Sequence, residues 1–158
     1  MRILFLGETY RADAQTWING LKEFGQAEIF TWELNQPSRG LKKILRAIES
    51  VARVFELHSY AKEINPDLII AERTTSYGFI AATLHKRFTI VIAQQGITDN
   101  YPFRSPLVPV KKMLQRYAFR HAAMVHAWGE AMTYSMIKAG VDPARIMVLA
   151  KGIDLRKY

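Results

Sequence analysis

The sequence predicts an α/β fold: a doubly wound, mostly parallel, Rossmann-like sheet with helices on both of its faces. Two features of the 158-residue chain favour this class. Short apolar runs alternate with longer stretches in which apolar residues recur at helical spacing. Most of the intervening stretches are ten residues or longer, which is the length that crossovers between parallel strands need. The length of the chain itself suits a single domain, residues 1–158.

Six runs are predicted as strands because they are short, apolar and bounded by turn residues. The first, 3–6, ends directly at Gly7, a residue that tolerates any backbone angle. The run at 88–93 is also rich in β-branched residues, which favour strands. The other strands are expected at 27–32, 68–71, 123–127 and 145–149.

Five helices are expected between these strands, at 14–24, 41–64, 76–86, 110–121 and 130–139. Gly25 and Gly140 follow two of them as predicted C-caps. The long helix, 41–64, is expected to place Phe55 on its core side and to stop at the Asn-Pro-Asp sequence that follows. Residues 94–109 hold three prolines and are predicted as a loop.

The helix at 110–121 carries an unusual charge pattern. Apolar residues at helical spacing define its expected core side: Val110, Met113, Leu114, Tyr117 and Ala118. Lys112, Arg116 and Arg120 repeat every fourth residue, and like charges at this spacing cost about 0.2–0.5 kcal/mol per pair. The whole chain has 22 Lys and Arg against 14 Asp and Glu, a formal charge of +8. Two interpretations stay open, a solvated face and a contact with an anionic partner such as a membrane.

Composition excludes several classes of protein. An apolar fraction of 49% excludes a disordered chain, and the absence of cysteine excludes disulfide scaffolds and Cys-ligated metal sites. The four histidines lack metal-ligand spacing, and structural roles are expected for His121 and His126. No P-loop, nucleophile elbow or complete G-x-G-x-x-G occurs, which argues against a hydrolase and a dinucleotide-dependent dehydrogenase. No apolar run has the length of a membrane span, and no signal peptide is recognised, so a cytoplasmic location is expected.

The last third of the chain carries a specific resemblance. Residues 94–96 (Gln-Gln-Gly) precede the basic helix, and the stretch 121–130 follows it. A Gly-capped helix then leads to 140–146 and to a closing block at 148–154 that contains Gly152-Ile153-Asp154. Together with Gly7 and the Pro-Asp-Leu-Ile-Ile sequence at 66–70, these motifs resemble the nucleotide-sugar-dependent glycosyltransferases of family 4, which have the GT-B fold. Two positions depart from the family pattern: Gln95 replaces a common histidine, and Lys151 replaces an asparagine.

The resemblance implies a role for the whole chain. It is similar to the N-terminal, acceptor-side domain of such an enzyme, and the C-terminal donor-binding domain of the family is absent from residues 1–158. We therefore expect a part of a hexosyltransferase-like enzyme that is inactive by itself. The expected partners are a nucleotide-sugar donor, a sugar or lipid-linked acceptor and the missing domain. No cofactor and no metal are expected, and the enzyme is expected in the cytoplasm, free or peripheral on the inner face of the membrane.

Ligands of doubly wound sheets bind beyond the carboxyl ends of the strands, at the point where the strand order reverses. We expect acceptor or cleft contacts in four loops at that edge, and we expect Gly7 and Gln95 to follow neighbouring strands. The candidate residues are Gly7, Glu8, Thr9 and Tyr10, then Arg73 and Thr74, then Gln95 and Gly96, with Trp128 and Glu130 as a weaker group. For Gly7 a simple turn, and for Arg73 a surface ion pair, are the alternatives.

A second hypothesis comes from another class of protein. The chain is then a non-catalytic, basic, Rossmann-like module that binds anionic membrane lipid or another phosphate-bearing partner through Lys112, Arg116 and Arg120. Nucleic acid is not expected as the partner, because no helix-turn-helix, stacking platform or zinc finger accompanies the charge.

Overall fold

Six parallel strands form one sheet in the computed structural model, which describes residues 1–34, 42–94 and 108–149. Each strand lies within one residue of its predicted bounds. The strands are β1 (Arg2–Leu6), β2 (Glu28–Trp32), β3 (Leu68–Glu72), β4 (Thr89–Ala93), β5 (Met124–Ala127) and β6 (Ile146–Val148). The doubly wound parallel sheet predicted from the sequence is therefore confirmed.

The strand order is β2-β1-β3-β4-β5-β6, and every pair is parallel. The chain moves outward from β1 to β2 and then crosses back to β3, so the order reverses between β1 and β3. Ligands of doubly wound sheets bind at such a reversal. The expectation that Gly7 and Gln95 follow neighbouring strands is wrong, because β3 lies between β1 and β4.

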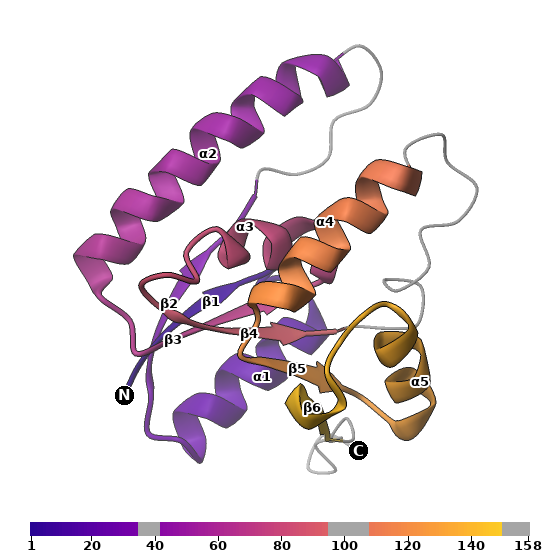
Figure 1. Cartoon of the computed structure of the whole chain (residues 1–158). Coiled ribbons are helices and arrows are strands. Elements are labelled where there is room, and N and C mark those ends of the chain that lie inside the picture. The colour runs from indigo at the N-terminus through magenta and orange to yellow at the C-terminus, as the bar shows by residue number, and fades with distance from the viewer. Residues whose placement is uncertain (35–41, 95–107, 150–158) are drawn as a thin grey trace.

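Helices cover both faces of the sheet, as expected (Figure 1). α1 (Ala12–Glu23) lies on one face. α2 (Lys42–Ile64), α3 (Phe79–Ala82), α4 (Val108–His121) and α5 (Glu130–Lys138) contribute to the core on the other face. In the described part of the chain, no helix is both long and apolar enough to cross a membrane.

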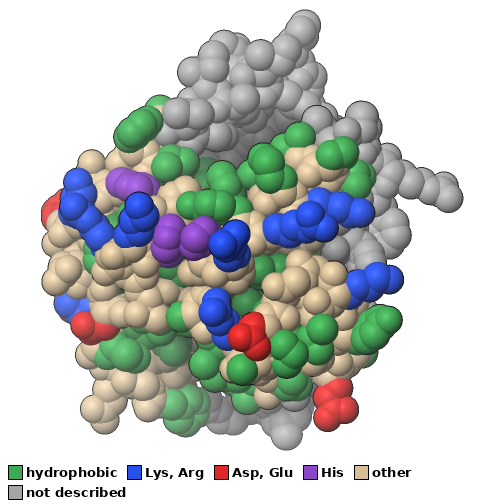
Figure 2. Space-filling model, viewed as in Figure 1, with side chains coloured by type: hydrophobic (Ala, Val, Ile, Leu, Met, Phe, Trp, Pro, Cys, Tyr) green, Lys and Arg blue, Asp and Glu red, His purple; other side chains and the backbone are tan. Residues whose placement is uncertain are grey.

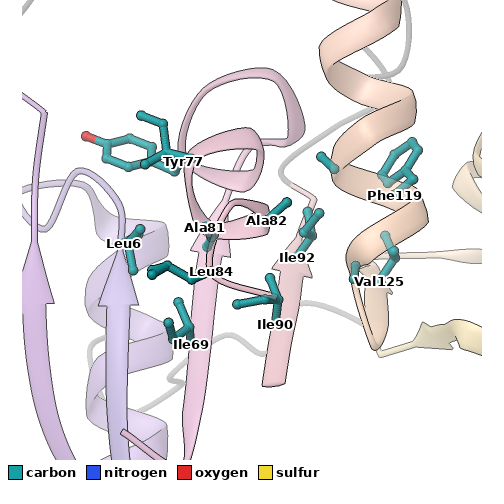
Figure 3. Packing of buried hydrophobic residues seen from close by; sticks show 14 of the residues in the cluster. Leu6, Ile69, Tyr77, Ala81, Ala82, Leu84, Ile90, Ile92, Phe119 and Val125 are labelled. Atoms are coloured by element: carbon teal, nitrogen blue, oxygen red, sulfur yellow. The ribbon is translucent and has the colours of Figure 1, made fainter. Parts of the chain in front are cut away.

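The alternation of side chains along β1 divides the core in two. Leu4 and Leu6 point into the larger cluster, which α2 to α5 cover, while Ile3 and Phe5 point toward α1. All four side chains are fully buried, which explains why the strand is apolar throughout. Figure 3 shows the centre of the larger cluster, where the chain after β3 packs its short side chains Ala81 and Ala82 over the sheet.

The helix predicted at 76–86 has a different form. A single π-helical turn, η1 (Thr74–Gly78), comes first and leads into the four-residue α3. A glycine is needed at position 78 of this turn, since an added Cβ would lie 2.9 Å from the carbonyl oxygen of Arg73. The turn thus brings Thr74 and the residues beside it close to the edge of the sheet.

Of the two predicted glycine caps, the one at Gly25 is wrong and the one at Gly140 is confirmed. α1 ends at Glu23 with Phe24 as its C-cap, and the left-handed residue is Gln26 (φ 46°) rather than Gly25. Gly25 is instead needed for space, because an added Cβ would lie 2.7 Å from the Leu21 carbonyl oxygen. The other glycine cap is confirmed, since Gly140 has a φ of 96° directly after the C-cap of α5.

α4 begins at Val108, two residues earlier than predicted, with Pro109 in its first turn. A proline is tolerated there because the first N–H groups of a helix have no intrahelical partner.

The core side of α4 also differs from the prediction. Gln115, Ala118 and Phe119 are buried, whereas Val110 and Met113 are 48% and 62% exposed. On α2, Phe55 is likewise exposed, and Leu57, Ala61 and Ile64 face the core. On α4, only Ala118 of the residues expected to face the core is fully buried, and on α2 the difference concerns residues 52–64, whose side chains the structure describes.

Candidate functional site

Polar side chains gather where β1, β2, β3 and β4 end at the carboxyl edge of the sheet. We call this group the edge cluster, and it consists of Glu8, Thr9, Glu33, Arg73, Thr74 and Gln94. The residues come from four separate loops, so the cluster exists only in the folded chain. It lies across the reversal of strand order between β1 and β3.

The centre of the edge cluster is a forked ion pair. The Arg73 guanidinium donates from Nη1 to Glu8 Oε1 at 2.9 Å and from Nη2 to Glu8 Oε2 at 2.8 Å. Arg11 donates a third hydrogen bond to Glu8 Oε2, at 3.2 Å. The Glu8 side chain is only 16% exposed, and a bidentate pair of this geometry fixes both partners. Arg73 thus forms an ion pair, which was the alternative given for this residue, and its partner Glu8 is itself one of the candidate cleft residues.

The surroundings of Glu8 keep it ionised. Burial raises the pKa of Glu8, but the charge of Arg73 and hydrogen bonds from Arg11, Arg73 and Tyr10 outweigh it, so the pKa lies below its ordinary value. Tyr10 is 62% exposed, and its pKa is raised by desolvation and by its interaction with Glu8. At neutral pH the site therefore presents a fixed carboxylate beside a protonated phenol.

The backbone at Arg73 adopts a rare conformation, with φ 61° and ψ 128°. A side-chain-bearing residue in this region costs on the order of 1–3 kcal/mol and persists only where neighbouring structure enforces it. Here the Arg73 N–H donates to the Ala93 carbonyl at 3.2 Å, and its own carbonyl accepts from the Gly78 N–H at 2.8 Å. The strained turn is what aims the guanidinium from the end of β3 across to Glu8.

The loop after β1 is also tied to the end of β2. Glu33 Oε1 accepts hydrogen bonds from the backbone N–H of Thr9, at 2.9 Å, and from the Thr9 hydroxyl. Gln15 of α1 donates from Nε2 to the Thr9 carbonyl at 2.5 Å. The loop that bears Glu8 is therefore held from two sides.

The third part of the edge cluster is buried. Thr74 and Gln94 are both fully buried, and the Thr74 hydroxyl donates to Gln94 Oε1 at 2.9 Å. The Gln94 N–H donates to the His126 carbonyl at 3.2 Å, which links this pair to β5. The two contacts fix Gln94 directly after β4.

An open hollow of about 450 Å³ lies beside the edge cluster, at the outer side of β2. Glu33 belongs to both features. The Arg53 side chain crosses one wall, where it lies 5.1 Å from the centre of the Trp32 ring and donates to Glu56. The lining residues are Thr31, Trp32, Glu33, Leu34, Arg53, Glu56 and Tyr60.

Six of the candidate residues come together at this edge: Gly7, Glu8, Thr9 and Tyr10 after β1, and Arg73 and Thr74 after β3. Gln95 and Gly96 lie outside the described residues. Trp128 and Glu130 follow β5, two strands beyond β3, where Trp128 packs against the core and Glu130 opens α5 with an exposed side chain. Lys112, Arg116 and Arg120 are exposed on α4.

Glu33, Glu72 and Gln94 were not among the candidate residues, although Glu72 and Gln94 open two of the four loops in which contacts were expected. Glu72 ends β3 and Gln94 directly follows β4, and a carboxylate or an amide at the end of a buried apolar strand is a signal that could have singled them out. Glu33 was harder to find from the sequence. It follows β2, the outermost strand on its side of the sheet, whereas ligands are expected at the reversal between β1 and β3.

His126 has the surroundings that a structural role requires, as expected from the sequence. His126 is buried in β5, its Nε2 hydrogen-bonds to the Leu149 carbonyl at 2.9 Å, and its ring meets Trp17 edge-on at 5.0 Å. Burial lowers the pKa of His126, so it is neutral at pH 7 and acts as a packed core residue. Among the described residues, no group of three or more potential ligands is placed to hold a metal ion.

The edge cluster therefore presents groups that form directional hydrogen bonds. A fixed carboxylate, a guanidinium and hydroxyl groups are the partners that bind sugar hydroxyls and anionic groups through directional hydrogen bonds.

Comparison with known structures shows the same architecture. A lipopolysaccharide outer core galactosyltransferase, WaaB in its apo form, matches with a TM-score of 0.71 and 16% identity, over 98% of this chain and 47% of that one. Anabaena Alr3699/HepE in complex with UDP-glucose matches with a TM-score of 0.69 and 21% identity, over 100% and 46%. A UDP-GlcNAc 2-epimerase from Methanocaldococcus jannaschii matches with a TM-score of 0.67 and 13% identity, over 94% and 45%.

The chain thus spans less than half the length of each of these proteins, and at such identities the likeness concerns the fold. No curated protein sequence matches it. The sequence model described as Glycosyltransferase Family 4 matches residues 21–157, which is most of the chain and includes five of its six strands. The protein belongs to glycosyltransferase family 4, and its fold is that of the N-terminal half of a GT-B enzyme.

Proposed function

We propose that this chain is the acceptor-side half of an enzyme that transfers a sugar from a nucleotide-sugar donor, and that it is inactive alone. The observation that carries the proposal is the forked Glu8–Arg73 pair at the reversal of strand order, in a chain of family 4. Ligands of doubly wound sheets bind at this point. The acceptor would meet the edge cluster, and the donor would be held mainly by a second domain.

The chemistry of the edge cluster supports an acceptor role. Glu8 stays ionised, so it can accept a hydrogen bond from an acceptor hydroxyl, and the guanidinium of Arg73 can donate to an acceptor oxygen. Their mutual contact positions both groups before the acceptor binds, which reduces the entropy lost on binding. The hollow beside Glu33 offers room for a further part of the acceptor.

The donor proposal is supported by the structural relatives, whose titles include UDP-glucose and UDP. Transfer of a sugar leaves a nucleoside diphosphate, whose developing charge must be stabilised. We assign that task to the second domain, because each of the matched structures continues over more than half its length beyond the part that this chain covers.

Calorimetry with the 158-residue chain tests the division of roles. We expect weak or undetectable binding of UDP-, GDP- and ADP-sugars and no measurable sugar transfer. A dissociation constant in the low micromolar range for any of these donors would show that the donor site lies in this half and would overturn the proposal.

A second experiment tests the acceptor site in a protein that joins this chain to a donor-binding domain of the family. Arg73→Lys loses the fork and should raise the acceptor KM by about three- to tenfold, with the donor KM unchanged. Lys62→Gln, an exposed change on α2, is the control and should leave both values as they are. A raised donor KM with an unchanged acceptor KM would indicate that the edge cluster binds the donor, and would overturn its assignment to the acceptor.

A further inference from the structure

Most of the positive charge of the chain comes from one segment. Residues 73–129 contain eight Lys and Arg and a single acidic residue, Asp99, while the whole chain has a formal charge of +8. In the described part of this segment the exposed cations are Lys86 and Arg87 after α3 and Lys112, Arg116 and Arg120 on α4. Figure 2 shows a band of Lys, Arg and His side chains across this side of the molecule.

Three exposed cations of α4, like Arg87, differ from five other arginines of the described chain in having no carboxylate partner. Five arginines there form ion pairs with carboxylates: Arg2, Arg11, Arg53, Arg73 and Arg145. No described carboxylate lies within ion-pair distance of Lys112, Arg116 or Arg120. These three side chains stand four residues apart along one side of the helix and repel one another, so an anionic surface would relieve an existing repulsion.

The exposed surface of α4 also carries apolar side chains. Met113 is 62% and Val110 48% exposed, because Gln115, Ala118 and Phe119 face the core instead. A helix that combines exposed Lys and Arg with exposed apolar groups has the composition of an interfacial, membrane-surface helix. We call this surface the α4 face, defined by Lys86, Arg87, Val110, Lys112, Met113, Arg116 and Arg120.

We propose that the α4 face docks the protein on a bilayer of anionic lipids. Such a bilayer can interact with both kinds of side chain on the face. The lipid phosphates attract the cations, and the acyl region accepts the apolar Met113 and Val110. A nucleic acid offers phosphates but no apolar surface for these two side chains, which is why we favour the membrane. The proposal does not depend on the acceptor role of the edge cluster.

The position of α4 makes docking compatible with that role. The helix follows β4 and returns across the sheet, so its first turns, with Lys112 and Met113, begin at the carboxyl edge where the edge cluster lies. A membrane that meets the α4 face would thus lie beside the edge cluster.

Co-sedimentation with lipid vesicles tests the proposal directly on the 158-residue chain. We expect binding to vesicles of phosphatidylglycerol and phosphatidylcholine, little binding to pure phosphatidylcholine, and release at high salt. The Lys112→Gln/Arg116→Gln variant should bind about 25-fold more weakly, since each charge near the surface contributes about fivefold. A matched control, Lys22→Gln/Lys138→Gln, removes the same charge from exposed positions on α1 and α5 and should change binding by less than about twofold.

Met113→Ser tests the apolar component, because it leaves every charge in place. It should weaken vesicle binding by several-fold and leave the melting temperature unchanged, since Met113 is largely exposed. If the Lys112→Gln/Arg116→Gln and Lys22→Gln/Lys138→Gln variants lose equal amounts of vesicle binding, the effect is due to net charge alone. That result would overturn the α4 face as a docking surface. Binding to duplex RNA that is tighter than binding to anionic vesicles would overturn the membrane as its partner.

Discussion

Gly7 and Glu72 are in contact at the ends of β1 and β3, and the contact leaves no space for a side chain at position 7. A Cβ added to Gly7 would lie 2.7 Å from Glu72 Oε2 and 2.8 Å from Phe5 Cε1. Glu72 is 1% exposed, so its carboxylate cannot move into solvent to make room. The glycine after the first strand is therefore needed for the packing of a buried carboxylate beneath the edge cluster, rather than only for a turn.

This contact predicts a large effect of Gly7→Ala. The new methyl group must displace Glu72 or Phe5, both of which are buried, so the free energy of unfolding should fall by about 1–3 kcal/mol. Gly20→Ala is the matched control, because Gly20 lies inside α1 with no atom within 4 Å of an added Cβ. That change should stabilise the protein by about 1 kcal/mol through helix propensity. Urea unfolding measures both, and two variants of equal stability would contradict the prediction.

The lowered pKa of Glu8 predicts that its contribution to stability depends on pH. Its pKa is lowered in the folded protein, so Glu8 stabilises the fold at pH values above the unfolded pKa, about 4.3 for glutamate. This contribution is lost as the pH falls through the folded pKa. The melting temperature of Glu8→Gln should therefore lie below that of the wild type at pH 6, and the difference should shrink toward pH 3.

The control for this experiment is Glu63→Gln, which changes an exposed glutamate on α2. Its melting curve should follow that of the wild type across the same pH range. A difference between Glu8→Gln and the wild type that stays constant from pH 6 to pH 3 would show that the fork does not control the ionisation of Glu8.

The strands were predictable because their signal is local. Each strand is a short apolar run, and both faces of the sheet are covered, so burial and sequence pattern coincide at every position of runs such as 3–6. The helix faces were harder to predict. On α4, Phe119 and Ala118 are buried in the core while Met113 remains exposed, and a helix with apolar residues on several sides does not specify which of them is buried.

The site was predictable in part. The doubly wound architecture indicates that loops at the carboxyl ends of the strands form the site, which makes Glu8 and Arg73 candidates. It does not give the strand order, and the neighbour of β1 at the reversal is β3 rather than the strand before Gln95. The fork between Glu8 and Arg73 depends on the positive φ of Arg73, and the sequence gives no sign of a left-handed conformation at an arginine. The contact between Thr9 and Glu33 depends on β2 lying next to β1, which follows from the strand order and not from any single residue.

The Thr74–Gln94 hydrogen bond predicts a difference between two small substitutions. Thr74→Val keeps the shape of the side chain but removes the hydroxyl that donates to Gln94 Oε1 at a fully buried site. The free energy of unfolding should fall by about 1–3 kcal/mol. Thr74→Ser keeps the donor and loses one methyl group, so it should cost less, about 0.8 kcal/mol. A Thr74→Val variant that is as stable as Thr74→Ser, measured by urea unfolding, would show that this hydrogen bond contributes little.

The position of His121 at the end of α4 predicts that vesicle binding depends on pH. Its ring stacks on His85 at 3.8 Å and lies 4.5 Å from that of Tyr117, with Arg120 and Lys86 as the nearby cations. Burial lowers the pKa of His121, and the charges of His85, Arg120 and Lys86 lower it further, so the ring is neutral at pH 7.5. Protonation requires a pH below its ordinary pKa of about 6.5, and the negative potential of an anionic bilayer favours it.

Binding of the 158-residue chain to phosphatidylglycerol vesicles should therefore strengthen as the pH falls from 7.5 to 5.5, by up to about fivefold for the charge gained at His121. His121→Gln removes that charge and should flatten this part of the pH dependence, while binding at pH 7.5, where His121 is neutral, stays the same. Co-sedimentation at a fixed ionic strength measures both. A pH profile of the His121→Gln variant that runs parallel to that of the wild type would show that His121 does not contribute to the pH dependence and would contradict the prediction.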